Sequence, residues 1–239
     1  MEKTRKSEFR AEVGAGVIAI TPLVISVAAY GLLWGALSAQ KGLSVLEAFL
    51  MSAFVFAGGS QFVALEVWST PVAVWTLGAT AFVVNLRLVL MGASLAPHIA
   101  GWSPAKTFAS LFFMADENWA LAMRRATGKG LTPAYYFAMA AMLYPVWVVS
   151  TPLGNYLGAG LSDPGRWGLD FAFAAVFLVL VMGFWRSPKK SIPCWSASAA
   201  AALIVYHTVE GAWYILAGGL AGTLVGYFQN GERGKEIKV

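Results

Sequence analysis

Six apolar stretches, each about as long as a lipid bilayer is thick, dominate this sequence. They cover residues 13–38, 44–69, 71–95, 107–123, 133–161 and 170–185. A helix needs roughly 20 residues to cross the ~30 Å hydrocarbon core of a membrane. The stretches do not alternate as the strands of a membrane barrel do, which leaves helices as the spanning element. A seventh stretch, 194–228, is long for one crossing and short for two. We therefore predict an all-α polytopic membrane protein with seven or eight transmembrane segments.

The low proportion of charged residues excludes an ordinary soluble protein. Of the 239 residues, 58% are hydrophobic and 12% are charged, whereas a soluble domain carries roughly 25% charged residues. So few polar side chains cannot coat a water-soluble globule of this size. The single cysteine, Cys194, excludes a disulfide framework, and the distant histidines His98 and His207 match no zinc spacing. We expect neither a metal site nor a cofactor.

Basic residues between the apolar stretches predict the orientation of the chain. Thirteen lie on one side and three on the other, with Arg87 left inside a stretch. The larger group is Lys3, Arg5, Lys6, Arg10, Arg124, Arg125, Lys129, Arg186, Lys189, Lys190, Arg233, Lys235 and Lys238, and the smaller is Lys41, Lys106 and Arg166. The positive-inside rule places the N-terminus in the cytoplasm. The positive charge thus reflects topology in lipid, and no nucleic-acid partner is expected.

The same pattern divides the chain into three parts. Residues 1–12 form a cytoplasmic N-terminal segment, 13–228 a single transmembrane domain, and 229–239 a polar tail. A signal peptide is the alternative for the first apolar stretch, but an apolar run of about 26 residues exceeds the usual ~7–15 of such a peptide. We expect this first helix to be retained.

An internal repeat with an offset of 123 residues is also predicted. Eight residues within 14–54 are identical to those 123 positions later, and four of them are glycine or proline. The pairs are Ala15/Ala138, Pro22/Pro145, Gly31/Gly154, Gly35/Gly158, Ala36/Ala159, Gly42/Gly165, Leu46/Leu169 and Phe54/Phe177. Repeated halves with interrupted helices are typical of secondary transporters. We therefore expect helix breaks at Pro22 and Pro145. The charged loops make the fourth stretch a crossing, which implies a parallel repeat, whereas an inverted repeat would require that the fourth stretch does not span the membrane.

Two polar clusters within the apolar stretches are candidates for a substrate site, since such groups are expensive in a membrane. The first is Gly58, Gly59, Ser60 and Gln61, which is either an unwound, ligand-facing segment or a site of close helix packing. The second is Asn85 with Arg87. Arg87 either extends to the membrane interface or binds a substrate carboxylate.

Two further clusters are candidates for proton coupling. Asp116 and Glu117 are adjacent carboxylates between apolar segments, and in a low dielectric both should not stay ionised. The simpler interpretation is an acidic helix end. His207 and Glu210 interrupt the last apolar stretch, where His207 either relays protons or is a satisfied buried histidine.

These clusters resemble the AzlC-type branched-chain amino acid permease family. The resemblance rests on residues 51–62, 85–87, 91–98 and 116–117, with a weaker match at 169–172. It implies the large subunit of an exporter in the bacterial inner membrane. It also implies a small, separately encoded AzlD-type membrane subunit as partner.

A secondary transporter that exports hydrophobic amino acids is therefore the leading hypothesis. Arg87 and the Asp116/Glu117 pair provide partners for the two charges of an amino acid, and no Walker sequence is present, which favours a proton gradient as the driving force. An intramembrane serine hydrolase using Ser60 and His207 is one alternative, although the closing glycine of a nucleophile elbow is missing. A channel or a non-transporting structural membrane subunit is the other.

Overall fold

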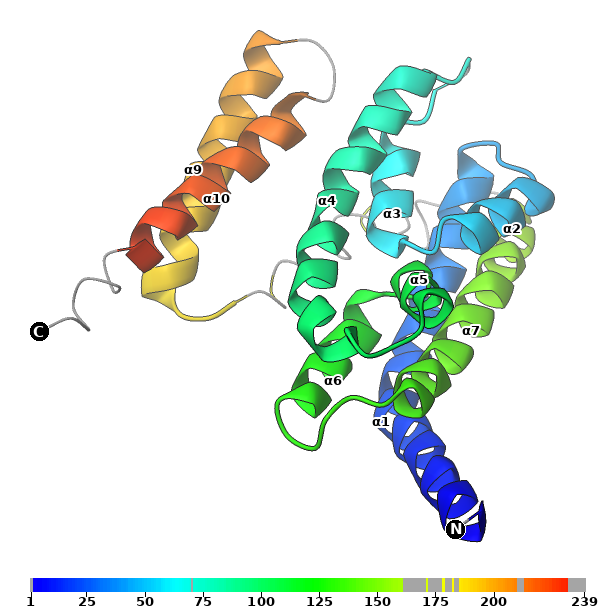
Figure 1. The fold of residues 1–239 in the computed structure, drawn as a ribbon. Coiled ribbons are helices and arrows are strands. Elements are labelled where there is room, and N and C mark those ends of the chain that lie inside the picture. The colour runs from blue at the N-terminus through cyan, green and yellow to red at the C-terminus, as the bar shows by residue number, and fades with distance from the viewer. Residues whose placement is uncertain are drawn as a thin grey trace, which may run out of the picture. The chain divides into compact units, whose positions relative to one another are not determined.

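The described part of the chain is helical and contains no strand (Figure 1). This computed structural model describes residues 2–69, 71–160, 185–209 and 213–231, and the single positions 171, 178 and 182. The helices are α1 (Glu2–Gln40), α2 (Val45–Phe54), α3 (Gly58–Glu66), α4 (Val74–Ile99), α5 (Pro104–Phe112), α6 (Asp116–Ala126), α7 (Pro133–Ala159), α9 (Pro188–Thr208) and α10 (Trp213–Gly231). Among these residues, three helices, α1, α4 and α7, are long and apolar enough to cross a membrane.

The chain forms two compact units. The first comprises residues 1–65 and 84–167, and the second residues 66–83 and 168–239. All of the predicted substrate-site residues and both Asp116 and Glu117 belong to the first unit. His207 and the predicted coupling residue Glu210 belong to the second, and Glu210 lies outside the described residues.

Helices α1 and α7 form the centre of the first unit and run in the same direction. Gly16 lies against the backbone of Tyr135 near the start of both helices, and Gly158 lies against Ala36 near the end of both. Figure 1 shows them side by side along most of their length. A side chain at Gly158 would collide with the backbone of α1, so the helices can approach this closely only because glycine stands there.

Both helices continue through their prolines. Pro22 lies inside α1, and Pro145 and Pro152 lie inside α7, without ending either helix. Contrary to the expected helix breaks at Pro22 and Pro145, each proline only leaves one carbonyl of the preceding turn without its helical N–H partner.

The residues that match at an offset of 123 are largely explained by this helix pair. Gly31 and Gly35 of α1 and their counterparts Gly154 and Gly158 of α7 all face the opposite helix. The helices are parallel, as the predicted repeat requires. The matches from Gly165 onward lie outside the described residues, and a repeat of whole halves stays a prediction.

The second predicted crossing, 44–69, is instead a helical hairpin. Ser44 caps α2 through a capping box with Glu47. Helix α2 ends at Phe54, and after three residues α3 begins at Gly58. The side chain of Gln61 donates a hydrogen bond to Ser52 Oγ at 3.1 Å, so the chain turns back between α2 and α3.

The fourth predicted crossing, 107–123, is a hairpin as well. Helix α5 ends at Phe112 and α6 begins at Asp116. Arg125 at the end of α6 pairs with Glu12 and lies over the ring of Tyr135, next to the start of α7. Trp102, just before α5, contacts Tyr136 at the same end. The interpretation of this stretch as a crossing is therefore wrong, and Lys106 near the start of α5 lies at the same end as Arg125.

Within the first unit, the two hairpins begin at opposite ends of α7. Near the end of α7, Asn155 donates to the carbonyl of Leu43, just before α2. Near its start, Tyr136 donates to the carbonyl of Ser110 in α5. Each hairpin is followed by a long helix, α4 or α7, and these two run in opposite directions. Hairpin plus long helix thus occurs twice with inverted topology, an arrangement typical of transporters.

The last apolar stretch forms two helices of the second unit. Ser198 of α9 donates to the carbonyl of Gly218 in α10 at 2.7 Å. Cys194, one turn earlier in α9, lies near Gln229 late in α10. The two helices are therefore antiparallel. This favours the interpretation of the stretch as a pair of segments over a single crossing.

Candidate functional site

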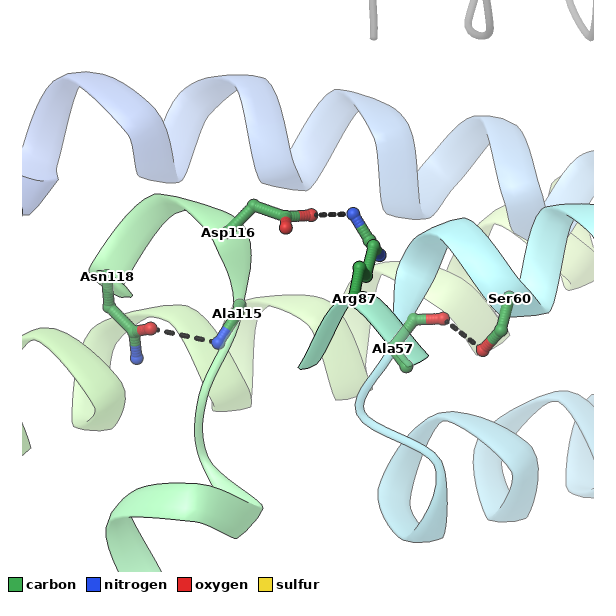
Figure 2. Close-up of polar contacts among 6 residues, drawn as sticks. All are labelled: Ala57, Ser60, Arg87, Ala115, Asp116 and Asn118. Carbon is green, nitrogen blue, oxygen red and sulfur yellow. Dashed lines mark hydrogen bonds and ion pairs between the residues drawn. The ribbon is translucent and has the colours of Figure 1, made fainter. Parts of the chain in front are cut away.

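An ion pair between Arg87 and Asp116 lies where the two hairpins meet (Figure 2). Arg87 projects from the middle of α4, and Asp116 is the first residue of α6. Their side chains are 29% and 38% exposed, so both charges are partly removed from solvent. The N-terminus of α6 adds a positive partial charge that also stabilises the carboxylate. The sequence predicted both residues as functional but assigned them to different roles.

The glycines of the first cluster begin α3 and are not unwound. The interruption lies just before them, at residues 55–57. A Cβ on Gly59 would lie 2.8 Å from Nη2 of Arg87, and a Cβ on Gly58 would lie 3.1 Å from the ring of Trp147. Glycine therefore allows the guanidinium of Arg87 to approach the first turn of α3.

Ser60 and Gln61 stabilise the α2–α3 hairpin. Ser60 Oγ donates to the carbonyl of Ala57 at 3.0 Å, as Figure 2 shows. The amide oxygen of Gln61 accepts a hydrogen bond from the indole N–H of Trp147 at 2.9 Å, while its nitrogen donates to Ser52. Ser60 and Gln61 are 1% and 0% exposed. Their polar groups are thus used within the protein, which supports a structural role for both.

Asn118 stabilises the start of α6 and was not predicted as a site residue. Its side-chain oxygen accepts a hydrogen bond from the N–H of Ala115 at 2.9 Å, and its nitrogen donates to the carbonyl of Phe113 at 2.7 Å. The side chain is fully buried. It closes the tip of the α5–α6 hairpin and so fixes the position of Asp116.

Tyr144 of α7 connects the two hairpin tips and was also missed. Its hydroxyl donates to the carbonyl of Ala53 in α2 at 2.9 Å. Its ring contacts Phe56 and Phe113, with ring centroids 5.3 and 5.0 Å apart. A tyrosine among the apolar residues of a helix carries no distinctive sequence signal, because its partners lie far away in the chain.

Two polar atoms of α4 are buried and have no hydrogen-bond partner among the described residues. They are Nε of Arg87, a donor of the ion-paired side chain, and Oδ1 of Asn85, an acceptor two residues earlier in the helix. Buried polar groups without partners are costly and call for an explanation. The first turn of α3 adds N–H groups that have no partner within the helix. The site therefore combines donors for an anion, from Arg87 and the first turn of α3, with one acceptor for a cation, the carboxylate of Asp116.

Of the remaining coupling candidates, Glu117 adjoins this ion pair, whereas His207 belongs to the second unit. Glu117 follows Asp116 in the first turn of α6. His207 lies near the end of α9 in the second unit, where it is exposed and its ring contacts that of Tyr206 at 5.4 Å.

Comparison with known proteins agrees with the family expected from the sequence. The model of the AzlC protein family matches residues 22–161. The inner membrane protein YgaZ of Escherichia coli is 27% identical over 87% of this chain and 86% of its own length. The branched-chain amino acid transport protein AzlC of Bacillus subtilis is 24% identical over 67% of this chain and 63% of its own length. No solved structure matches the chain significantly.

The matched range of the family model contains α2 to α7 and therefore both hairpins, Arg87 and Asp116. It covers more than half of the chain, and further relatives are also membrane proteins, including one from Helicobacter pylori that is 25% identical over 78% of this chain and 80% of its own length. The chain belongs to the AzlC family of membrane transport proteins.

Proposed function

We propose that this chain is the large subunit of a secondary transporter that exports branched-chain amino acids, with proton entry as the driving force. The observation that carries the proposal is the Arg87–Asp116 ion pair at the junction of two inverted hairpins. Sites of this kind, where broken helices meet inside a membrane domain, are where transporters bind their substrates.

The charges at this junction match the main-chain groups of an amino acid. A zwitterion needs donors for its carboxylate, and Arg87 and the N–H groups of the first turn of α3 supply them. It also needs an acceptor for its ammonium, and the carboxylate of Asp116 supplies this. These three groups recognise the part that is common to all amino acids.

An apolar cavity beside the junction supports a preference for aliphatic side chains. It has a volume of about 710 Å³ and lies between α4 and α5, where Leu88, Gly92 and Leu111 are among the residues that line it. Leu88 directly follows Arg87 in α4. A hydrophobic side chain of the substrate would bury its surface here, whereas a charged one would lose its hydration.

We further propose that the protein resides in the bacterial inner membrane with its N-terminus in the cytoplasm, and that it works with a small AzlD-type membrane subunit. The orientation rests on the excess of basic residues at one end, to which the placement of Lys106 adds one more. The small subunit rests on the family resemblance.

Transport is preferred to hydrolysis because Ser60 is not arranged as a nucleophile. It is almost fully buried, and its hydroxyl donates to the backbone of its own hairpin. A serine-reactive fluorophosphonate should therefore leave the protein unlabelled.

The proposal is tested in liposomes that contain the protein with and without a small membrane protein encoded next to it. Vesicles loaded with labelled leucine, valine or methionine should lose the label by saturable exchange with external amino acid. Arg87→Ala provides the inactive control. A flux that does not saturate would indicate a pore, and absence of any flux with both subunits present would overturn the proposal.

A further inference from the structure

We infer that the carboxylate of Asp116 is one site shared by three partners in turn: Arg87 in the empty carrier, the ammonium of the amino acid in the loaded carrier, and a proton in the returning carrier. The inference rests on the proposed function and adds to it the rule by which protons and substrate are coupled. It begins from the position of the ion pair, which joins α4 to the first turn of α6.

The ion pair holds two separate structural elements together at the junction. Arg87 belongs to a long helix, whereas Asp116 belongs to the tip of the α5–α6 hairpin. Nearby, the indole N–H of Trp119 lies within hydrogen-bond distance of the carbonyl of Met91, at 3.1 Å, and of Ser94 Oγ, at 3.0 Å, so the same two elements meet again one turn further on. Movement of the hairpin tip away from α4 therefore requires that Arg87 and Asp116 separate.

Separation of this pair leaves two partly buried charges without partners, which is strongly unfavourable. In an empty carrier with an ionised Asp116, the ion pair therefore opposes movement of the α5–α6 hairpin tip away from α4. The guanidinium keeps unused hydrogen-bonding capacity, because Nε of Arg87 is buried without a partner among the described residues, and Nη2 lies next to the first turn of α3. The pair is therefore poised to be divided by a ligand that satisfies both of its members.

An amino acid is such a ligand. Its carboxylate replaces Asp116 at the guanidinium, and its ammonium replaces Arg87 at the carboxylate of Asp116. Each charge exchanges one partner of opposite sign for another, so the loaded site stays neutral and the ion pair no longer joins the two elements. Uncharged molecules of similar shape satisfy neither charge and leave the ion pair intact.

A proton on Asp116 releases the ion pair in a different way. Among the described residues, the charged groups next to Asp116 are Arg87 from α4 and Glu117 beside it in α6. Once protonated, Asp116 no longer attracts the guanidinium strongly, and it no longer binds an ammonium. Proton and substrate therefore exclude each other, and the carrier moves with one or the other. The result is a one-to-one exchange in which each exported amino acid is followed by one entering proton.

The test compares exchange with net efflux in liposomes that contain wild-type protein and its small subunit, with labelled leucine inside. Exchange with external leucine requires no return of the empty carrier, so its rate should depend little on pH. Net efflux into leucine-free buffer requires return with a proton. Its rate should therefore fall as the pH on both sides of the membrane is raised.

The variant Asp116→Asn removes both the ion pair and the proton site. Without the ion pair, the empty carrier can change conformation without binding a proton. The rate of net efflux should therefore equal the rate of exchange and should no longer depend on pH. Accumulation against a leucine gradient driven by a pH difference should be lost. The matched control is Glu12→Gln. Glu12 of α1 pairs with Arg125 at the end of α6, so this variant removes an acid that is paired with α6 but should keep the wild-type pH dependence.

The inference is overturned if wild-type net efflux follows the same pH dependence as exchange, a result that does not depend on any variant folding. It is also overturned if the pH dependence persists in Asp116→Asn, or if only Glu117→Gln removes it. Absence of leucine, isoleucine and valine exchange in the wild type would instead overturn the proposed function itself.

Discussion

The hydroxyl of Tyr144 donates a hydrogen bond to the carbonyl oxygen of Ala53 at 2.9 Å, which attaches the tip of the α2–α3 hairpin to the middle of α7. In Tyr144→Phe this carbonyl loses its partner, and a buried polar group left unpaired costs about 1–3 kcal/mol. We expect a Tm lower by roughly 2–10 °C in detergent solution. The control Tyr156→Phe changes an exposed tyrosine of the same helix, and an equal loss there would show that the Ala53 contact is not the cause.

Gly59→Ala should impair transport more than it impairs stability. The new Cβ would lie 2.8 Å from Nη2 of Arg87, so the guanidinium must move away from the first turn of α3. We expect a loss of leucine exchange of about tenfold or more with little change in Tm, since a mispositioned binding group costs affinity directly. Gly14→Ala is the matched control, because nothing lies within 4 Å of a Cβ at that position. Parent-like exchange in Gly59→Ala would remove α3 from the site.

Gly58→Leu should act through packing. The space next to Gly58 is filled by Trp147, with 3.1 Å between the ring and an added Cβ. A leucine side chain would displace this buried indole, which also donates to Gln61, and overpacking of this kind costs about 1–3 kcal/mol. We expect reduced Tm together with loss of transport. Normal efflux at normal membrane levels would contradict the assigned packing.

Arg87→Lys should reduce exchange strongly although the positive charge is kept. Lysine lacks the planar pair of N–H donors that can engage a carboxylate and a helix terminus together. We expect a loss of at least tenfold in the rate of leucine exchange at low substrate concentration, measured in liposomes. A lysine variant that matches the wild type would show that a point charge is sufficient at this position.

Cysteine labelling distinguishes a hairpin from a crossing at α5–α6. In a Cys194→Ser background, cysteines placed at Ser7 and at Lys106 should both resist an impermeant maleimide in intact cells, whereas a cysteine at Lys41 should react. The sequence interpretation placed Lys106 and Lys41 on the same side. Labelling at Lys106 would restore the crossing, and labelling at Ser7 would reverse the topology.

The long helices and the central ion pair were accessible from sequence alone. Hydropathy located α1, α4 and α7 because a continuous apolar run of this length has few other uses. Arg87 and Asp116 were identified because charges within such runs are expensive. Sequence spacing did not reveal that they pair. The two residues are 29 positions apart, and no helical periodicity relates positions in α4 to positions in the α5–α6 hairpin.

The hairpins were missed because two short helices and one crossing have the same length and the same apolar composition. A weak sequence similarity between the two hairpins was nevertheless present at an offset of 58 residues. Ser52, Phe54 and Ala57 in one hairpin correspond to Ser110, Phe112 and Ala115 in the other. Comparison at the offset of 123 overlooked this relationship, because three short matches between inverted elements are weaker than the glycine pattern shared by α1 and α7.

The parallel course of α1 and α7 has a consequence for how that pair is held together. Two parallel helices place like ends of their dipoles side by side, so electrostatics between the helices opposes their association. The attraction comes from van der Waals contact across the glycine surface, which weakens when the surfaces separate by about 0.5–1 Å, and from the hydrogen bond that Asn155 donates to Ser38 Oγ at 2.8 Å. Helices α1 and α7 are therefore expected to move as one rigid body, to which Tyr144 and Trp147 also attach the α2–α3 hairpin.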